Sequence, residues 1–64
     1  MASCHAEIYH KNGSVDKVAY VNDGSRSLDG AKQMCMFLAQ QQFDQEMRTF
    51  QDPFKPTHIQ IVVD

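Results

Sequence analysis

The residues of this sequence that could do chemistry are its two cysteines and three histidines. Cys4 and His5 are adjacent, a pairing that could supply a thiol nucleophile and its base. They lie in a strand pattern, however, and neighbouring side chains of a strand point to opposite faces of the sheet. Cys35 falls on the apolar side of a predicted helix, where a thiol usually packs as an inert small side chain. We therefore predict no catalytic cysteine and no enzymatic activity.

The same residue types lack the spacing of a metal site. The sequence contains no CxxC and no HxxxH pattern. His5 and His58 are expected to share one sheet face on neighbouring strands, but two ligands alone hold a metal weakly. The segment NDGSRSLDG has neither a Walker lysine nor the GxGxxG spacing, so we interpret it as a loop that leads to a helix cap. We expect surface histidines, no metal and no cofactor.

Length and composition predict one small globular domain that spans residues 1–64. A chain of this size buries only about 60% of its unfolded surface, so a partner or a dimer contact often adds stability. The net charge of -2 argues against direct nucleic-acid binding, because such binding needs a basic surface.

The apolar stretches are too short to cross a membrane, since the longest lies around Met34 to Ala39. The N-terminal residues MASCHAEIYH lack a basic region followed by a long apolar core, so we expect no secretion signal. Two cysteines without such a signal are expected to be reduced thiols in the cytoplasm. A bridge between Cys4 and Cys35 is the less favoured alternative.

A hairpin is predicted within EIYHKNGSVDKVAYV, residues 7–21. Asn12–Gly13 suits the two central positions of a type I′ turn, both of which need positive φ. That turn would pair Cys4 with Val21 and continue in register along both strands, and paired residues share a face. The expected core face carries Cys4, Ala6, Ile8, Val15, Ala19 and Val21. The expected outer face carries His5, Glu7, Tyr9, Asp16, Val18 and Tyr20.

A long amphipathic helix is predicted from Leu28 to Phe50. At 100° per residue its apolar side chains form one broad stripe. The stripe contains Leu28, Ala31, Met34, Cys35, Leu38, Ala39, Phe43, Met47 and Phe50. Phe37 falls on the opposite side and should be exposed. Ser25, Ser27 or Asp29 can cap the start of the helix. A helix of about 35 Å is longer than a strand of about 23 Å, so part of it must overhang the sheet or bend.

A third strand is predicted for THIQIVV, residues 57–63, after Pro53 and Pro56 have ended the helix. Thr57, Ile59, Ile61 and Val63 should point inward, and His58, Gln60 and Val62 outward. If the helix crosses over the first strand in the usual right-handed sense, the third strand lies antiparallel beside the first. The predicted fold class is α+β: ββαβ, a three-stranded antiparallel sheet of order 2-1-3 with one long helix packed on one face.

One helix can cover only one face of a sheet, so the outer face should be accessible to a partner. Tyrosine is typical of the residues that contribute most to protein interfaces. We predict Tyr9, Tyr20 and Phe37 as apolar anchors, with nearby carboxylates for charge complementarity. The predicted partner-binding residues are Tyr9, Tyr20, Phe37, Glu7, Asp16, Asp23 and Asp29. The alternatives are that tyrosine merely favours strands and that scattered acidic residues merely solubilise the surface.

VAYVND followed by SLDGAKQM resembles the strand-then-helix segment of HicB-type antitoxins. That resemblance implies a small regulatory interaction module that acts as a homodimer.

The whole chain is similar to compact phage-encoded anti-CRISPR proteins in its size, mild acidity and ββαβ order. EIYHKNGSVDKVAYV corresponds to the hairpin and THIQIVV to the closing strand. The resemblance implies a non-catalytic inhibitor in the bacterial host cytoplasm that binds a Cas effector subunit. It would block target DNA binding by steric cover or by acidic DNA mimicry, as a monomer or a homodimer.

Overall fold

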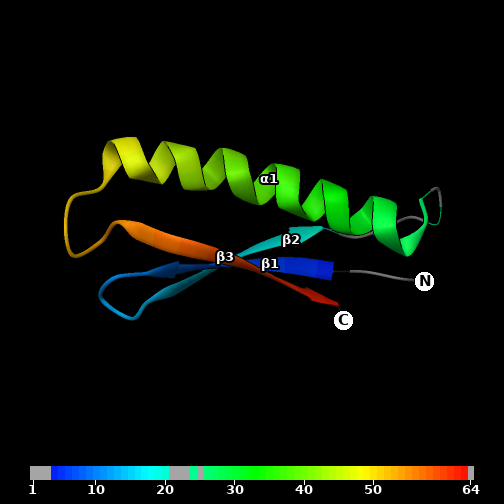
Figure 1. Ribbon diagram of the computed structural model, residues 1–64, viewed down its shortest axis with the longest axis horizontal. Helices are drawn as coiled ribbons and strands as arrows, with labels where there is room; N and C mark the ends of the chain where they lie inside the picture. Colours follow the sequence, from blue (N-terminus) through cyan, green and yellow to red (C-terminus); the bar gives the residue numbers. More distant parts are fainter. Residues whose placement is uncertain (1–3, 21–23, 25, 64) are drawn as a thin grey trace.

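The computed structural model describes residues 4–20, 24 and 26–63. Its elements are β1 (Cys4–His10), β2 (Val15–Tyr20), α1 (Leu28–Thr49) and β3 (Pro56–Val63). The strands form one antiparallel sheet in the order β2-β1-β3, and α1 lies across one face of it (Figure 1). The predicted fold class, an α+β domain of ββαβ order with β1 at the centre of the sheet, is confirmed.

The hairpin between β1 and β2 does not have the predicted turn. Only Gly13 takes positive φ there, at 93°, and Asn12 does not, so a type I′ turn cannot form. The amide of His10 instead donates to the carbonyl of Ser14, which encloses a three-residue loop. The side-chain oxygen of Asn12 accepts bonds from the amide and the hydroxyl of Ser14, at 3.0 and 2.7 Å. These bonds stabilise the turn with asparagine in an ordinary conformation.

The longer loop shifts the strand register by one residue and turns β2 over. Cys4 pairs with Tyr20, where the prediction paired it with Val21. Because side chains alternate along a strand, such a shift moves each one to the other face. The face that α1 covers therefore carries three residues that were predicted on the outer face: Asp16, Val18 and Tyr20. Predicted in the core but exposed are Val15 and Ala19. Val21 lies outside the described residues.

Helix α1 starts where the sequence predicted and ends at Thr49. Of the three predicted caps, Ser27 does the capping, because its hydroxyl oxygen accepts a bond from the Gly30 amide at 3.2 Å. Ser25 lies outside the described residues. The most buried positions of the helix are the small residues Ala31, Cys35 and Ala39. Their size lets α1 approach β1 closely, where Ala6 and Ile8 are also fully buried.

Cys4 and Cys35 form a disulfide in this core, so the prediction of reduced thiols is wrong. That prediction was inferred from the expected cellular compartment. The fold, however, brings the two cysteines together, with their Cα atoms 6.8 Å apart. Cys4 begins β1 and points toward α1, directly opposite the buried face of the helix. Tyr20 and Ile61 pack against the bridge from the two flanking strands.

The third strand follows the predicted alternation in its centre. Ile59 and Ile61 are partly buried, while His58 and Gln60 are exposed. A bulge opposite Tyr9 and His10 disturbs the start of β3, and Thr57, predicted to point inward, is exposed.

The ends of the helix stripe are exposed, as expected for a helix longer than its sheet. Leu28 and Met47 are 38% and 41% exposed. Figure 1 shows the first turns of α1 running on past the strands. Within the described ranges, no helix combines the length and apolarity that crossing a membrane requires.

Candidate functional site

The face of the sheet opposite α1 is left uncovered by the described segments (Figure 1). We call it the open face. It consists of His5, Glu7 and Tyr9 from β1, Val15, Lys17 and Ala19 from β2, and His58, Gln60 and Val62 from β3.

An ordered aromatic pair stands on the open face. The rings of Tyr9 and His58 stack with centroids 4.6 Å apart and planes within 5°. The Tyr9 hydroxyl donates a hydrogen bond of 2.9 Å to a carboxylate oxygen of Glu7, and this bond raises the pKa of Tyr9. The second oxygen of Glu7 lies 3.6 Å from His5 Nε2. The tyrosine ring is therefore held in one orientation by its own neighbours on the sheet.

The structure divides the predicted partner-binding residues among several places. Tyr9 and Glu7 lie on the open face. Phe37 is 56% exposed on α1, but it follows Cys35 by about 200° around the helix and points away from the sheet. One flat partner surface cannot contact Tyr9 and Phe37 together. Asp29 is exposed in the first turn of α1.

The prediction placed two further residues on the open face, and this was wrong because its strand register was wrong by one residue. Tyr20 packs against the disulfide, and Asp16 lies under the last turns of α1. Asp23 lies outside the described residues. The predicted anchors thus reduce to one aromatic on the open face and one on the opposite side of the molecule.

Beneath α1 lies a buried polar cluster that the sequence analysis missed. His10 and Glu46 are 7% and 6% exposed. His10 Nε2 lies 2.5 Å from one oxygen of Glu46 and 3.5 Å from Asp16 Oδ2, and His10 Nδ1 lies 3.1 Å from the Ser14 carbonyl oxygen. Both ring nitrogens face hydrogen-bond acceptors, an arrangement that favours the doubly protonated, charged form of the ring. The hydrogen bond with Glu46 is the main cause that raises the pKa of His10.

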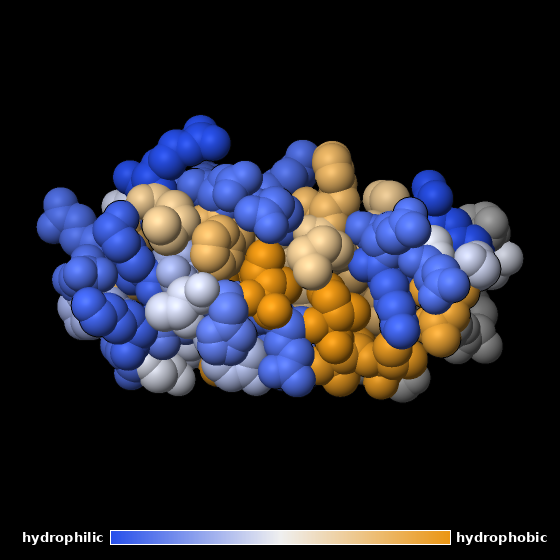
Figure 2. All heavy atoms as spheres, in the orientation of Figure 1, coloured by the Kyte–Doolittle hydropathy of each residue, from blue (hydrophilic) through white to orange (hydrophobic). Residues whose placement is uncertain are grey.

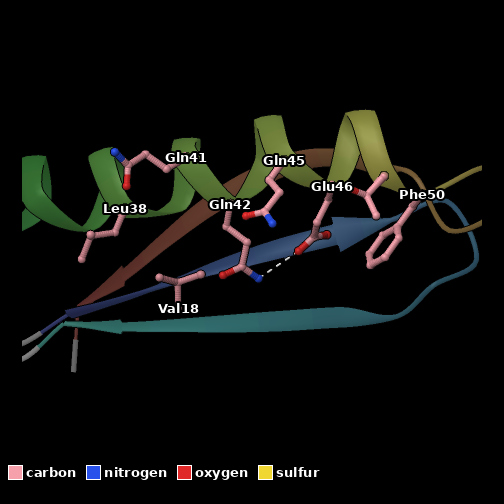
Figure 3. Close-up of a pocket in the computed structure, with 8 residues that line it drawn as sticks. Val18, Leu38, Gln41, Gln42, Gln45, Glu46 and Phe50 are labelled. Atoms are coloured by element: carbon pink, nitrogen blue, oxygen red, sulfur yellow. Dashed lines mark hydrogen bonds between the residues drawn. The ribbon is translucent and has the colours of Figure 1, made fainter.

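Glu46 stays ionised in spite of its burial. Burial acts to raise its pKa, but hydrogen bonds from His10 and Gln42 outweigh it and lower the pKa overall. Gln42 donates to the second carboxylate oxygen at 2.9 Å (Figure 3). A signal for this residue was present in the sequence. Glu46 follows Cys35 by about three helical turns and so falls on the stripe that faces the sheet.

Two hollows adjoin the cluster. A groove of about 520 Å³ runs between α1 and β2 and is lined by Leu38, Gln42, Glu46 and Phe50 among others (Figure 3). A second hollow, of about 410 Å³, is lined by His10, Asp16, Phe50 and Phe54 among others. Solvent and small solutes can therefore reach the cluster from the side.

A separate apolar patch lies near the end of β3. Met36, Ile61 and Val63 line a hollow there, and Figure 2 shows apolar residues gathered where this strand meets the middle of α1.

Fold and site define a class: a small α+β domain with a disulfide core, an open sheet face that bears a fixed aromatic pair, and a buried ionic cluster. The disulfide leaves neither cysteine free as a nucleophile. No family model matches the chain, and no curated protein or solved structure is significantly similar to it.

Proposed function

We propose that this protein is a non-catalytic inhibitor that binds a bacterial protein through the open face. The partner proposed for testing is a Cas effector subunit in the host cytoplasm, whose access to target DNA the bound inhibitor would block. The observation that carries the proposal is the Tyr9–His58 stack, which is uncovered and already fixed by the bond to Glu7. A side chain that is ordered in advance loses little entropy on binding, and tyrosine is enriched among interface hot spots.

The charges favour steric contact over acidic mimicry of DNA. Glu7 is paired across the strands with Lys17, so the open face is not uniformly negative. Asp16 belongs to the buried cluster, and Asp29 lies at the start of α1, away from Glu7. Partner contact through Tyr9 and His58, with Glu7 supplying complementarity, is therefore the mechanism we propose.

The test is inhibition and binding by matched aromatic variants. Purified wild type should bind an effector complex and prevent it from binding target DNA. Tyr9→Ala should weaken binding by about 2 kcal/mol, roughly 30-fold in Kd. Phe37→Ala is the control, because Phe37 is also aromatic and is more exposed than Tyr9 but lies on the opposite side, and the affinity of this variant should stay within about twofold of wild type. Unchanged affinity in both Tyr9→Ala and His58→Ala would show that the open face is not the contact surface.

A homodimeric, antitoxin-like module is the second candidate. The observation that favours it is that β2 and β3 are both edge strands, with backbone groups that could pair with a second copy. Light scattering tests this candidate, because it requires the mass of two chains and the mass of one chain would exclude it. A toxin gene beside the reading frame would support it further.

A further inference from the structure

Three potential metal ligands meet beneath the last turns of α1, each from a different element. His10 ends β1, Asp16 lies near the start of β2, and Glu46 lies on α1. One ligand atom of each residue lies within 4.8 Å of the other two. The two carboxylates would neutralise a divalent cation, and imidazole with carboxylates is a ligand set that Zn²⁺ accepts.

The two separations from His10 can be compared with those of a zinc site, and the two carboxylate oxygens lie within 4.8 Å of each other. Two atoms bound to one tetrahedral zinc at about 2.0–2.2 Å are about 3.3–3.5 Å apart. His10 Nε2 and Asp16 Oδ2 already have this separation, 3.5 Å. His10 Nε2 and Glu46 Oε1 lie 2.5 Å apart in a hydrogen bond and would separate by about 1 Å as the ion displaces the proton of that bond to solvent.

Outer contacts already orient two of the ligands. His10 Nδ1 donates to the Ser14 carbonyl at 3.1 Å, which directs Nε2 toward the two carboxylates. Metal-binding histidines usually have their other ring nitrogen fixed in this way. Gln42 holds Oε2 of Glu46 and leaves Oε1 toward the cluster.

The hollow beside His10 and Asp16 gives an ion an entry path and room for a water ligand. We propose that His10, Asp16 and Glu46 bind one divalent transition-metal ion, with Zn²⁺ as the probe and water at the remaining position. Three protein ligands and an open position are the arrangement of a reactive zinc site. This site is separate from the open face and does not depend on the function proposed for that face.

The test is calorimetric titration of the metal-free chain with ZnCl₂ near neutral pH. The expected result is one ion per chain. Asp16→Asn is the main variant, because the Asp16 side chain is 47% exposed and its loss should leave the fold intact. It should weaken binding at least about tenfold, the scale on which even outer-shell changes act. Asp44→Asn is the matched control, since Asp44 is exposed on α1, lies outside the cluster and accepts a hydrogen bond from Gln40.

A second readout identifies the ligands. Co²⁺ in place of Zn²⁺ should give visible absorption bands in wild type that Asp16→Asn and Glu46→Gln lose or shift, with circular dichroism confirming that both variants fold. Absence of Zn²⁺ binding up to about 1 mM, the weak limit of ordinary affinities, would overturn the proposal. So would wild-type affinity in both variants, because the ion would then bind elsewhere, for example at His5.

Discussion

Reduction of the Cys4–Cys35 disulfide should remove about half of the stability of this domain. The bridge joins residues 31 positions apart in the chain. Closing a loop of that length restricts the unfolded chain and contributes about 3–4 kcal/mol at 25 °C. A single core in a domain this small rarely supplies more than about 3–5 kcal/mol in all. The reduced protein should therefore keep at most about 3–5 kcal/mol, roughly half of the stability of the oxidised form.

Urea unfolding followed by circular dichroism, with and without a phosphine reductant, measures this difference directly. The expected result is a loss of about 3–4 kcal/mol in the free energy of unfolding on reduction. A Cys4→Ala, Cys35→Ala double variant is the control, since it should be as unstable as the reduced protein or more so, and should not respond to reductant. A change of less than about 1 kcal/mol in wild type would refute the reasoning, because the loop-closure contribution would then be absent.

The same numbers bear on the proposed cytoplasmic role. Thiols are held reduced in that compartment, so the chain would act there without its cross-link. A partner present at about 100 times its Kd would restore about 2.7 kcal/mol, most of what reduction removes. Binding to the folded chain, in which the Tyr9–His58 stack is already ordered, would then offset most of the stability lost on reduction.

Two further predictions concern stability. The His10–Glu46 pair should stabilise the fold most between about pH 4.5 and 6.5. The raised pKa of His10 gives a contribution that is full below 6.5 and is lost as pH rises through the folded value, and the lowered pKa of Glu46 gives one that is lost as pH falls through its folded value. Glu46→Gln should flatten this pH profile of unfolding, and an unchanged profile would contradict the assignment. Gly13→Ala should destabilise by about 1 kcal/mol because of its positive φ. Gly30→Ala, in the first turn of α1, should stabilise by up to about 1 kcal/mol, because the added Cβ would meet Arg26 and Ser27 at 3.4 and 3.6 Å, in van der Waals contact. Equal effects in thermal melts would refute the difference.

The element order, the helix start and the inward side of β3 were predictable because they are local properties. A run such as Ile59 and Ile61 alternating with polar residues predicts its own buried face. The helix stripe around Ala31 and Cys35 does the same at a period of 3.6 residues. Neither inference needs knowledge of any other part of the chain.

Which side chains of β2 point toward α1 was not predictable in this way. It depends on the length of the turn before β2, and the turn residues are compatible with two lengths. Asn12–Gly13 suits a two-residue turn, and the same residues also suit a three-residue loop in which only Gly13 has positive φ. The bonds from Ser14 to the Asn12 side chain favour the second solution. The two turns differ in length by one residue, and a register shift of one residue moves every side chain of β2 to the other face of the sheet.

Packing against α1 explains why the longer loop prevails, and it also explains the cluster. The predicted register would have set Val21 opposite Cys4, beside the disulfide, whereas the observed register sets Tyr20 there, and a tyrosine buries more apolar area than a valine. The same shift exchanges Lys17 for Asp16 opposite Ile8, on the face that α1 covers. Glu46 thus has a second carboxylate as its neighbour where the predicted register offered an ammonium group. A positive charge is needed to offset the two carboxylates. The protonated ring of His10 supplies this charge, and on the proposal above a metal ion bound to His10 would replace the proton and supply it instead.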